Sequence, residues 1–96
     1  MLIYKLGYFA ISLAGHDKGR IYMIVSEEGE MLGLCDGRHR LIGNPKYKKK
    51  KHVQMIRSER MAELFPELMK SGDIDLRIRM AIRDLEKKRE RNQEDI

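Results

Sequence analysis

The chain has 96 residues, of which 42% are hydrophobic and 36% are charged, and it carries a formal net charge of +5. This composition excludes an intrinsically disordered protein and fits a soluble globular chain with polar extensions. Its single cysteine, Cys35, excludes an internal disulfide framework and a zinc site built from several cysteines. Because Cys35 ends the apolar run Met31–Cys35, we expect a buried structural thiol in a reducing compartment.

The excess positive charge belongs entirely to the first part of the chain. Residues 1–57 contain 11 Lys and Arg against 5 Asp and Glu, a net +6, whereas residues 58–96 contain 9 against 10, a net −1. An anionic partner is therefore expected to meet the N-terminal part. The change in character at Ser58 predicts a basic domain at 1–57 and a helical extension with a frayed polar tail at 58–96.

No segment approaches the roughly 20 apolar residues of a membrane span. The apolar start Met1–Gly15 has a length typical of a signal peptide, but it lacks a basic leading segment, and Lys5 falls close to the apolar stretch. Cleavage there would also delete the first predicted strand. We therefore expect a cytoplasmic protein that does not bind membranes.

Five short, strand-like runs bounded by turn residues predict five β-strands. In the second run, Ile21, Met23 and Val25 share one face and Tyr22 and Ile24 the other, so this strand should be central or covered by another element. Five short strands joined by tight turns favour a small β-barrel. The predicted strands are Tyr8–Leu13, Arg20–Ser26, Met31–Cys35, Arg38–Ile42 and His52–Arg57.

Glycine-containing turns join these strands. Gly15 and Gly19 can take positive φ in the first turn. Asp36 and Gly37 form a dipeptide typical of a two-residue type I′ hairpin between the third and fourth strands. Pro45 then breaks the chain, and the lysine run that follows it is expected to form a loop.

Helical spacing begins after Ser58, which is a suitable N-cap. Apolar residues between positions 61 and 69 predict a first helix that Pro66 breaks or shortens. A second apolar stripe at i, i+4, i+7, i+8 and i+11 from Ile74 predicts a helix over about residues 74–88 that frays through 91–96.

Basic residues concentrate in three predicted loops. Lys and Arg neutralise nucleic-acid phosphates, and RNA helices are recognised largely through backbone and shape, so a lysine-rich loop suits RNA. A tyrosine within the lysine run could stack on an exposed base, although the run could also be only a solvated, solubilising loop. The candidate RNA-binding residues are His16, Lys18, Gly19, Arg20, Arg38, Arg40, Lys46, Tyr47, Lys48, Lys49, Lys50, Lys51 and His52.

The run Gly7–Arg20 resembles a KOW motif, in the Ser-x-x-Gly-Arg-Asp-Lys-Gly version found in KOW-domain RNA-binding proteins of Gram-positive bacteria. These proteins are relatives of large-subunit ribosomal proteins of archaea and eukaryotes. The same family carries Asp-Gly-x-x-Arg and then Pro-Lys-x-Lys-Asn-x-Lys-His, which correspond here to Asp36–Arg40 and Pro45–His52. The resemblance covers about residues 4–57, with the three motifs in order and at this spacing.

The resemblance implies an SH3-like barrel of about five strands that binds ribosomal RNA. Gly19 matches the KOW glycine, and Lys18 and Arg20 match its basic flanks. The chain departs from the family pattern at three positions. His16 stands where Arg is usual, Ala10 where a larger aliphatic residue is common, and Lys49 where Asn is usual. The first departure weakens one phosphate contact unless His16 is protonated, and the third adds a charge.

Other chemistry has little support in the sequence. A metal site at His16, His39 and His52 would need neutral imidazoles among many cations, and no Cys or carboxylate spacing supports one. No nucleophile motif and no phosphate-cradling Gly-x-x-x-x-Gly-Lys run is present. We therefore expect no metal, no cofactor and no catalytic activity.

The sequence thus predicts an α+β protein, a small SH3-like (KOW) barrel followed by two C-terminal helices, that acts as a non-enzymatic, ribosome-associated RNA-binding protein. The helices either cover the barrel or contact ribosomal proteins. Two alternatives remain open, a protein-interaction module that uses the Met61–Met69 face and a transcription accessory that binds DNA. Cations of the last helix, including Arg79 and Arg83, could form a second contact surface, but they alternate with acidic residues such as Glu86, so a solvated helix face is favoured.

Overall fold

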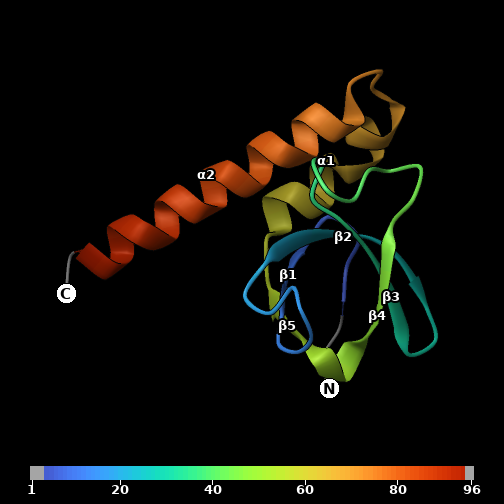
Figure 1. The fold of residues 1–96 in the computed structure, drawn as a ribbon. Helices are drawn as coiled ribbons and strands as arrows, with labels where there is room; N and C mark the ends of the chain where they lie inside the picture. Colours follow the sequence, from blue (N-terminus) through green and yellow to red (C-terminus); the bar gives the residue numbers. More distant parts are fainter. Residues whose placement is uncertain (1–3, 95–96) are drawn as a thin grey trace.

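The computed structural model describes residues 4–94, which form a five-stranded antiparallel sheet followed by two helices (Figure 1). The predicted α+β class and the order of strands before helices are therefore confirmed. The elements are β1 (Phe9–Ser12), β2 (Ile21–Glu28), β3 (Met31–Cys35), β4 (Lys46–Lys49), the 3₁₀ helix η1 (Lys50–His52), β5 (Val53–Ile56), α1 (Glu59–Lys70) and α2 (Ile74–Glu94).

The sheet is not closed into a barrel, and the prediction of closure is wrong. Its strand order is β4-β3-β2-β1-β5, so β4 and β5 form its two edges. Within residues 4–94, β4 pairs with β3 and β5 pairs with β1, but no ladder joins β4 to β5. Only η1 separates these two strands, and its single turn carries the chain between the edges without laying the strands side by side.

β2 is the central strand and is covered on both faces, as its two-sided apolar pattern predicts. Met23 and Val25 belong to a core shared with Phe65 of α1 and Ile78 of α2. The opposite face carries a second core, which includes Tyr8, Ala10, Tyr22, Ile24, Leu32, Leu34 and Val53. The first core therefore holds the helices against one face of the sheet, and the second fills the opposite face.

The predicted fourth strand, Arg38–Ile42, is wrong, because these residues form a loop and the next strand is the lysine-rich segment Lys46–Lys49. The two-residue hairpin predicted at Asp36 is wrong for the same reason. The Asp36 carboxylate Oδ1 accepts hydrogen bonds from the backbone N–H groups of Arg38, His39 and Arg40, at 2.8–2.9 Å. These bonds fold the segment into a compact loop instead of a strand.

Helix α1 begins at the predicted cap, where Ser58 Oγ accepts a hydrogen bond from the Met61 backbone N–H at 3.3 Å. The expected break at Pro66 is absent, since α1 runs continuously from Glu59 to Lys70. Phe65 and Leu68, on either side of the proline, are both buried in the core. This packing on both sides holds the helix together despite the one backbone bond that proline cannot make.

Helix α2 extends to Glu94, beyond the predicted end near residue 88, and part of the expected frayed segment lies outside the described residues. Figure 1 shows α2 crossing the helical side of the molecule, with its C-terminal part extending past the sheet. No helix within residues 4–94 is long and apolar enough to cross a membrane.

Two glycines set how closely the helices approach the sheet. A Cβ on Gly7 would lie 2.6 Å from the Met61 carbonyl oxygen of α1, and one on Gly37 would lie 2.1 Å from the Asp75 carbonyl oxygen of α2. Both glycines have positive φ, +98° and +75°. The loop after β3 is therefore seated directly on the backbone of α2, and Ile42 N–H donates to Asp75 Oδ1 at 2.7 Å.

Candidate nucleic-acid interface

The turn between β1 and β2 is organised around a buried carboxylate. Asp17 is only 6% exposed. Its Oδ1 accepts a hydrogen bond from Ser12 Oγ at 2.8 Å and its Oδ2 one from the Tyr22 hydroxyl at 2.6 Å. Gly15 and Gly19 flank it with φ of +86° and +91°, so the predicted positive φ is confirmed at both. The turn is thereby fixed to both of its strands.

Two residues of the lysine run also converge on Asp17. Lys46 Nζ lies 2.9 Å from Oδ2 and Lys48 Nζ lies 3.2 Å from Oδ1, and Lys48 also donates to the Ala14 carbonyl at 2.8 Å. The Lys48 side chain is only 11% exposed. These two lysines therefore fix β4 to the turn, which differs from the outward, phosphate-facing position expected for them.

The network changes the acidity of its members. Burial opposes ionisation of Asp17, but hydrogen bonds from Tyr22, Lys46, Ser12 and Lys48 outweigh it and hold the pKa of Asp17 well below its usual range. Burial, reinforced by the Asp17 carboxylate, raises the pKa of Tyr22 to about 12. The carboxylate is thus charged and the phenol neutral throughout the physiological range.

The rest of the lysine run divides between structural and exposed positions. Lys50 lies 2.5 Å from Glu27 Oε2, and its ammonium stands 5.5 Å from the centre of the Tyr4 ring. Tyr47 is 55% exposed, and it shares the outward side of β4 with Lys49. The remaining two members, Lys51 and His52, are exposed in and beside η1. Only part of this run is available to a partner.

The loop after β3 presents a second set of basic side chains. Asp36 is buried, with its Oδ1 bonded to three backbone N–H groups and its Oδ2 lying 3.3 Å from His39 Nδ1. Burial opposes ionisation, but the N–H donors of Arg40 and Arg38 outweigh it and lower the pKa of Asp36. Arg38 and His39 are exposed, whereas Arg40 is partly buried.

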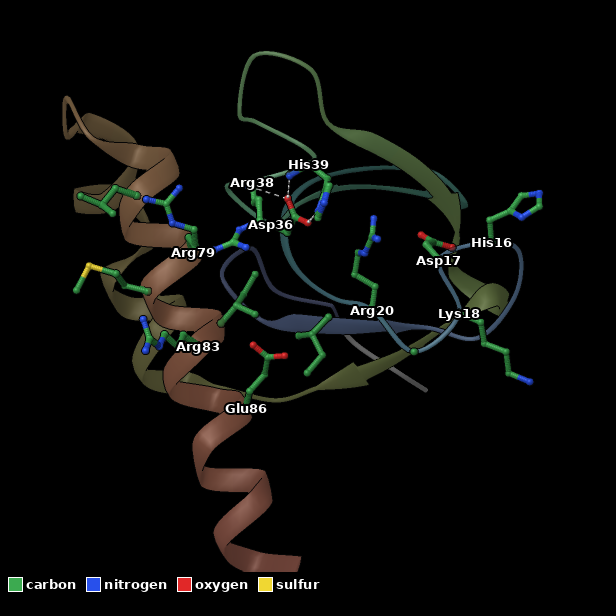
Figure 2. Close-up of a pocket in the computed structure, with 15 residues that line it drawn as sticks. His16, Asp17, Lys18, Arg20, Asp36, Arg38, His39, Arg79, Arg83 and Glu86 are labelled. Carbon is green, nitrogen blue, oxygen red and sulfur yellow. Dashed lines mark hydrogen bonds and ion pairs between the residues drawn. The ribbon is translucent and has the colours of Figure 1, made fainter.

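These loops meet α2 around one open groove of about 770 Å³, which we call the arginine groove. Figure 2 shows its residues arriving from three separate parts of the chain. Its polar and charged lining residues are His16, Asp17, Lys18, Arg20, Asp36, Arg38, His39, Arg79, Arg83 and Glu86. Ile21 and Ile82 contribute apolar surface.

Arginine is the main cation of this groove. In Figure 2, Arg20 extends toward the loop that carries Asp36 and His39, whereas His16 and Lys18 point away from α2. Arg79 donates from Nη1 to the Gly37 carbonyl at 3.3 Å, which places it at the junction of loop and helix. Within residues 4–94, Arg20 and Arg38 form no ion pair with an acidic side chain.

Five of the predicted RNA-binding residues therefore line the arginine groove. They are His16, Lys18, Gly19, Arg20 and Arg38. The structure leaves Arg40, Lys46, Tyr47, Lys48, Lys49, Lys50, Lys51 and His52 outside the groove. A solvated face was the favoured expectation for the helix residues Arg79, Arg83 and Glu86, with a second contact surface formed by the arginines as the alternative. The sequence offered one signal that these residues lie near the sheet, namely that they are close in sequence to Ile78 and Ile82 of the apolar stripe, which is buried.

A second hollow of about 880 Å³ lies between α1 and α2. It is lined by Met61, Leu64, Met80 and Leu85 together with Arg60, Lys70, Arg77 and other polar residues. In the part of the chain that the structure describes, no group of three His, Cys, Asp or Glu is arranged to hold a metal ion.

No protein-family model matches the chain, and no curated protein is significantly similar to it.

Proposed function

We propose that the chain is a KOW-type, non-enzymatic RNA-binding protein that docks on structured ribosomal RNA. The observation that carries this proposal is the gathering of unpaired arginine and lysine side chains, from segments far apart in sequence, around one groove. Arginine presents five N–H donors in a planar fork that suits phosphate oxygens. A groove of this kind supplies both the charge and the geometry that an RNA backbone requires.

The KOW assignment has separate support. Both glycines of the first turn have the positive φ that the motif requires, and Lys18 and Arg20 are exposed on either side of Gly19. An SH3-like identity is consistent with the five antiparallel strands and the 3₁₀ turn before the last of them. Exposed Tyr47, Lys49 and Lys51 extend the basic surface beyond the groove.

Fluorescence anisotropy with a labelled ribosomal RNA hairpin and a duplex DNA of equal length tests the proposal. The double variant Lys18→Gln/Arg20→Gln should weaken RNA binding and lower the slope of log affinity against log salt by about 2. The matched control is Arg60→Gln/Lys70→Gln, which removes the same two charge types from the second hollow. This control should bind RNA like the wild type.

Three results would overturn the proposal. They are an affinity that does not change between about 50 and about 200 mM salt, tighter binding to the DNA than to the RNA, and equal losses in the double variant and its control. In-cell crosslinking with sequencing of the attached RNA then identifies the RNA bound.

A protein-interaction role remains the alternative, and the exposed side chains of Leu64 and Met80 in the second hollow are the observation that favours it. It predicts that changes in the Met61–Met69 face abolish partner binding while the groove variants keep it.

A further inference from the structure

Three carboxylates line the arginine groove, and two of them are already fully engaged by the protein. Asp17 accepts from Ser12 and Tyr22 and is paired with Lys46 and Lys48. The second, Asp36, is bonded to three backbone N–H groups and to His39, as described above. Neither has capacity left for a ligand.

Glu86 is different. Its side chain forms no hydrogen bond or ion pair with any group in the described part of the chain, and it is exposed. Figure 2 shows its carboxylate directed from α2 toward the sheet side of the groove. A free carboxylate repels phosphate, so a groove that bound only phosphates would bind them better without it. A ligand that brings N–H donors to this end would suit the groove better than a phosphate alone.

The space between Glu86 and the arginines has an apolar floor. Ile21 forms its accessible part, because Ile21 is partly exposed whereas Ile82 is only 7% exposed. The volume of about 770 Å³ falls within the range of small-molecule sites. An apolar floor with cations at one end and a carboxylate at the other matches the parts of a single nucleotide, whose base has flat apolar faces.

We propose that the arginine groove binds one unpaired guanine nucleotide of the RNA, an inference that rests on the proposed function. Its phosphate lies against Arg20, Arg38 and Arg79, its base covers Ile21, and its N1–H and N2–H₂ groups donate to the two oxygens of Glu86. A carboxylate accepts two parallel hydrogen bonds and donates none when it is ionised. Among the four bases, guanine alone presents two adjacent N–H donors on its Watson–Crick edge.

The test uses single-stranded oligouridine RNAs that carry one central guanosine, inosine or adenosine. Inosine lacks the N2 amino group and keeps N1–H. The wild type should bind the guanosine RNA about tenfold more tightly than the other two. Glu86→Gln should remove this preference. Glu90→Gln, one turn further along α2 and outside the groove, should keep it.

The readout is the ratio of affinities, because loss of any acidic residue raises binding to every RNA by a general charge effect. Circular dichroism verifies that both variants retain α2. A wild type that binds all three RNAs equally, or a preference that survives Glu86→Gln, overturns the guanine site and leaves RNA binding intact.

Competition with GMP distinguishes a guanine held within RNA from a free guanine nucleotide as the ligand. Weak competition by GMP supports a guanine held within RNA. If the wild type binds none of these oligouridines, a guanine site for RNA fails, whereas the proposed function is decided separately by binding to the ribosomal RNA hairpin. Binding of GMP that Glu86→Gln abolishes would then still support a guanine site, filled by a free nucleotide.

Discussion

The hydroxyl of Tyr22 donates a 2.6 Å hydrogen bond to the buried carboxylate of Asp17, and this bond joins the first turn to the central strand of the sheet. Because the same carboxylate pairs with two lysines of β4, one acidic residue connects three segments of the chain. The arginine groove is built on this connection, since Asp17 and its neighbours form one of its walls.

Replacing Asp17 by Asn should strongly destabilise the fold. The change leaves Lys46 and Lys48 close together without their counter-charge, and the loss of one partner from a buried ion pair typically costs about 3 kcal/mol or more. Urea unfolding measures the change in the free energy of unfolding. Asp73→Asn is the control, because its ion pair with Arg77 is exposed to solvent and contributes little to stability. Equal losses in the two variants would contradict a special role for Asp17.

The same carboxylate predicts loss of stability in acid. The pKa of Asp17 is lowered in the folded state, whereas in the unfolded chain it is near about 3.9. The unfolded chain therefore binds the proton first as the pH falls, so the stabilisation is present above about pH 5 and is lost progressively below it. Unfolding free energies measured down to about pH 2 should show the wild type approaching the Asp17→Asn variant. A constant gap between them would be inconsistent with this account.

Gly37→Ala should destabilise the protein more than Gly19→Ala. Both glycines have positive φ, which costs a side chain about 1 kcal/mol. A Cβ at Gly19 meets nothing within 4 Å, whereas one at Gly37 meets the backbone of α2. Overpacking there adds about 1–3 kcal/mol. Thermal unfolding compares the variants, and similar melting temperatures would show that loop and helix are not tightly seated.

Lysines next to each other in sequence should behave in opposite ways. Lys48→Gln removes bonds to Asp17 and Ala14 and should cost about 2 kcal/mol of stability. Lys49→Gln, on the outward side of β4, should change stability by less than about 0.5 kcal/mol. It should instead reduce the salt slope of RNA binding by about 1. Urea unfolding and anisotropy titrations together separate the two roles, and a reversal would disprove the assignment.

The strands built from largely apolar runs, β1, β2 and β3, were predictable from the sequence. The two-sided pattern of β2 located the centre of the sheet, because Met23 and Tyr22 must both be buried on opposite faces. β4 was not predictable in this way. Its inward residues are lysines, and their burial depends on Asp17, a residue about thirty positions earlier that hydropathy cannot connect to them.

The candidate site was predictable only in part. The basic loops follow from composition, but the groove depends on how closely the Asp36 loop approaches α2 at Gly37. That approach places Arg79 and Glu86 in the lining of the same groove as Arg20. In the sequence, these helix residues cannot be distinguished from the other charges of α2, because an exposed helix face and a groove wall have the same composition.

The open sheet has a further consequence for how two copies of the protein meet. An unpaired edge strand can add a strand from a second molecule, and proteins commonly prevent this with lysines and proline along the edge. The β4 edge begins directly after Pro45 and consists of Lys46, Tyr47, Lys48 and Lys49. We therefore expect Pro45 and the lysines of this edge to disfavour edge-to-edge aggregation, a role that is independent of any nucleic acid.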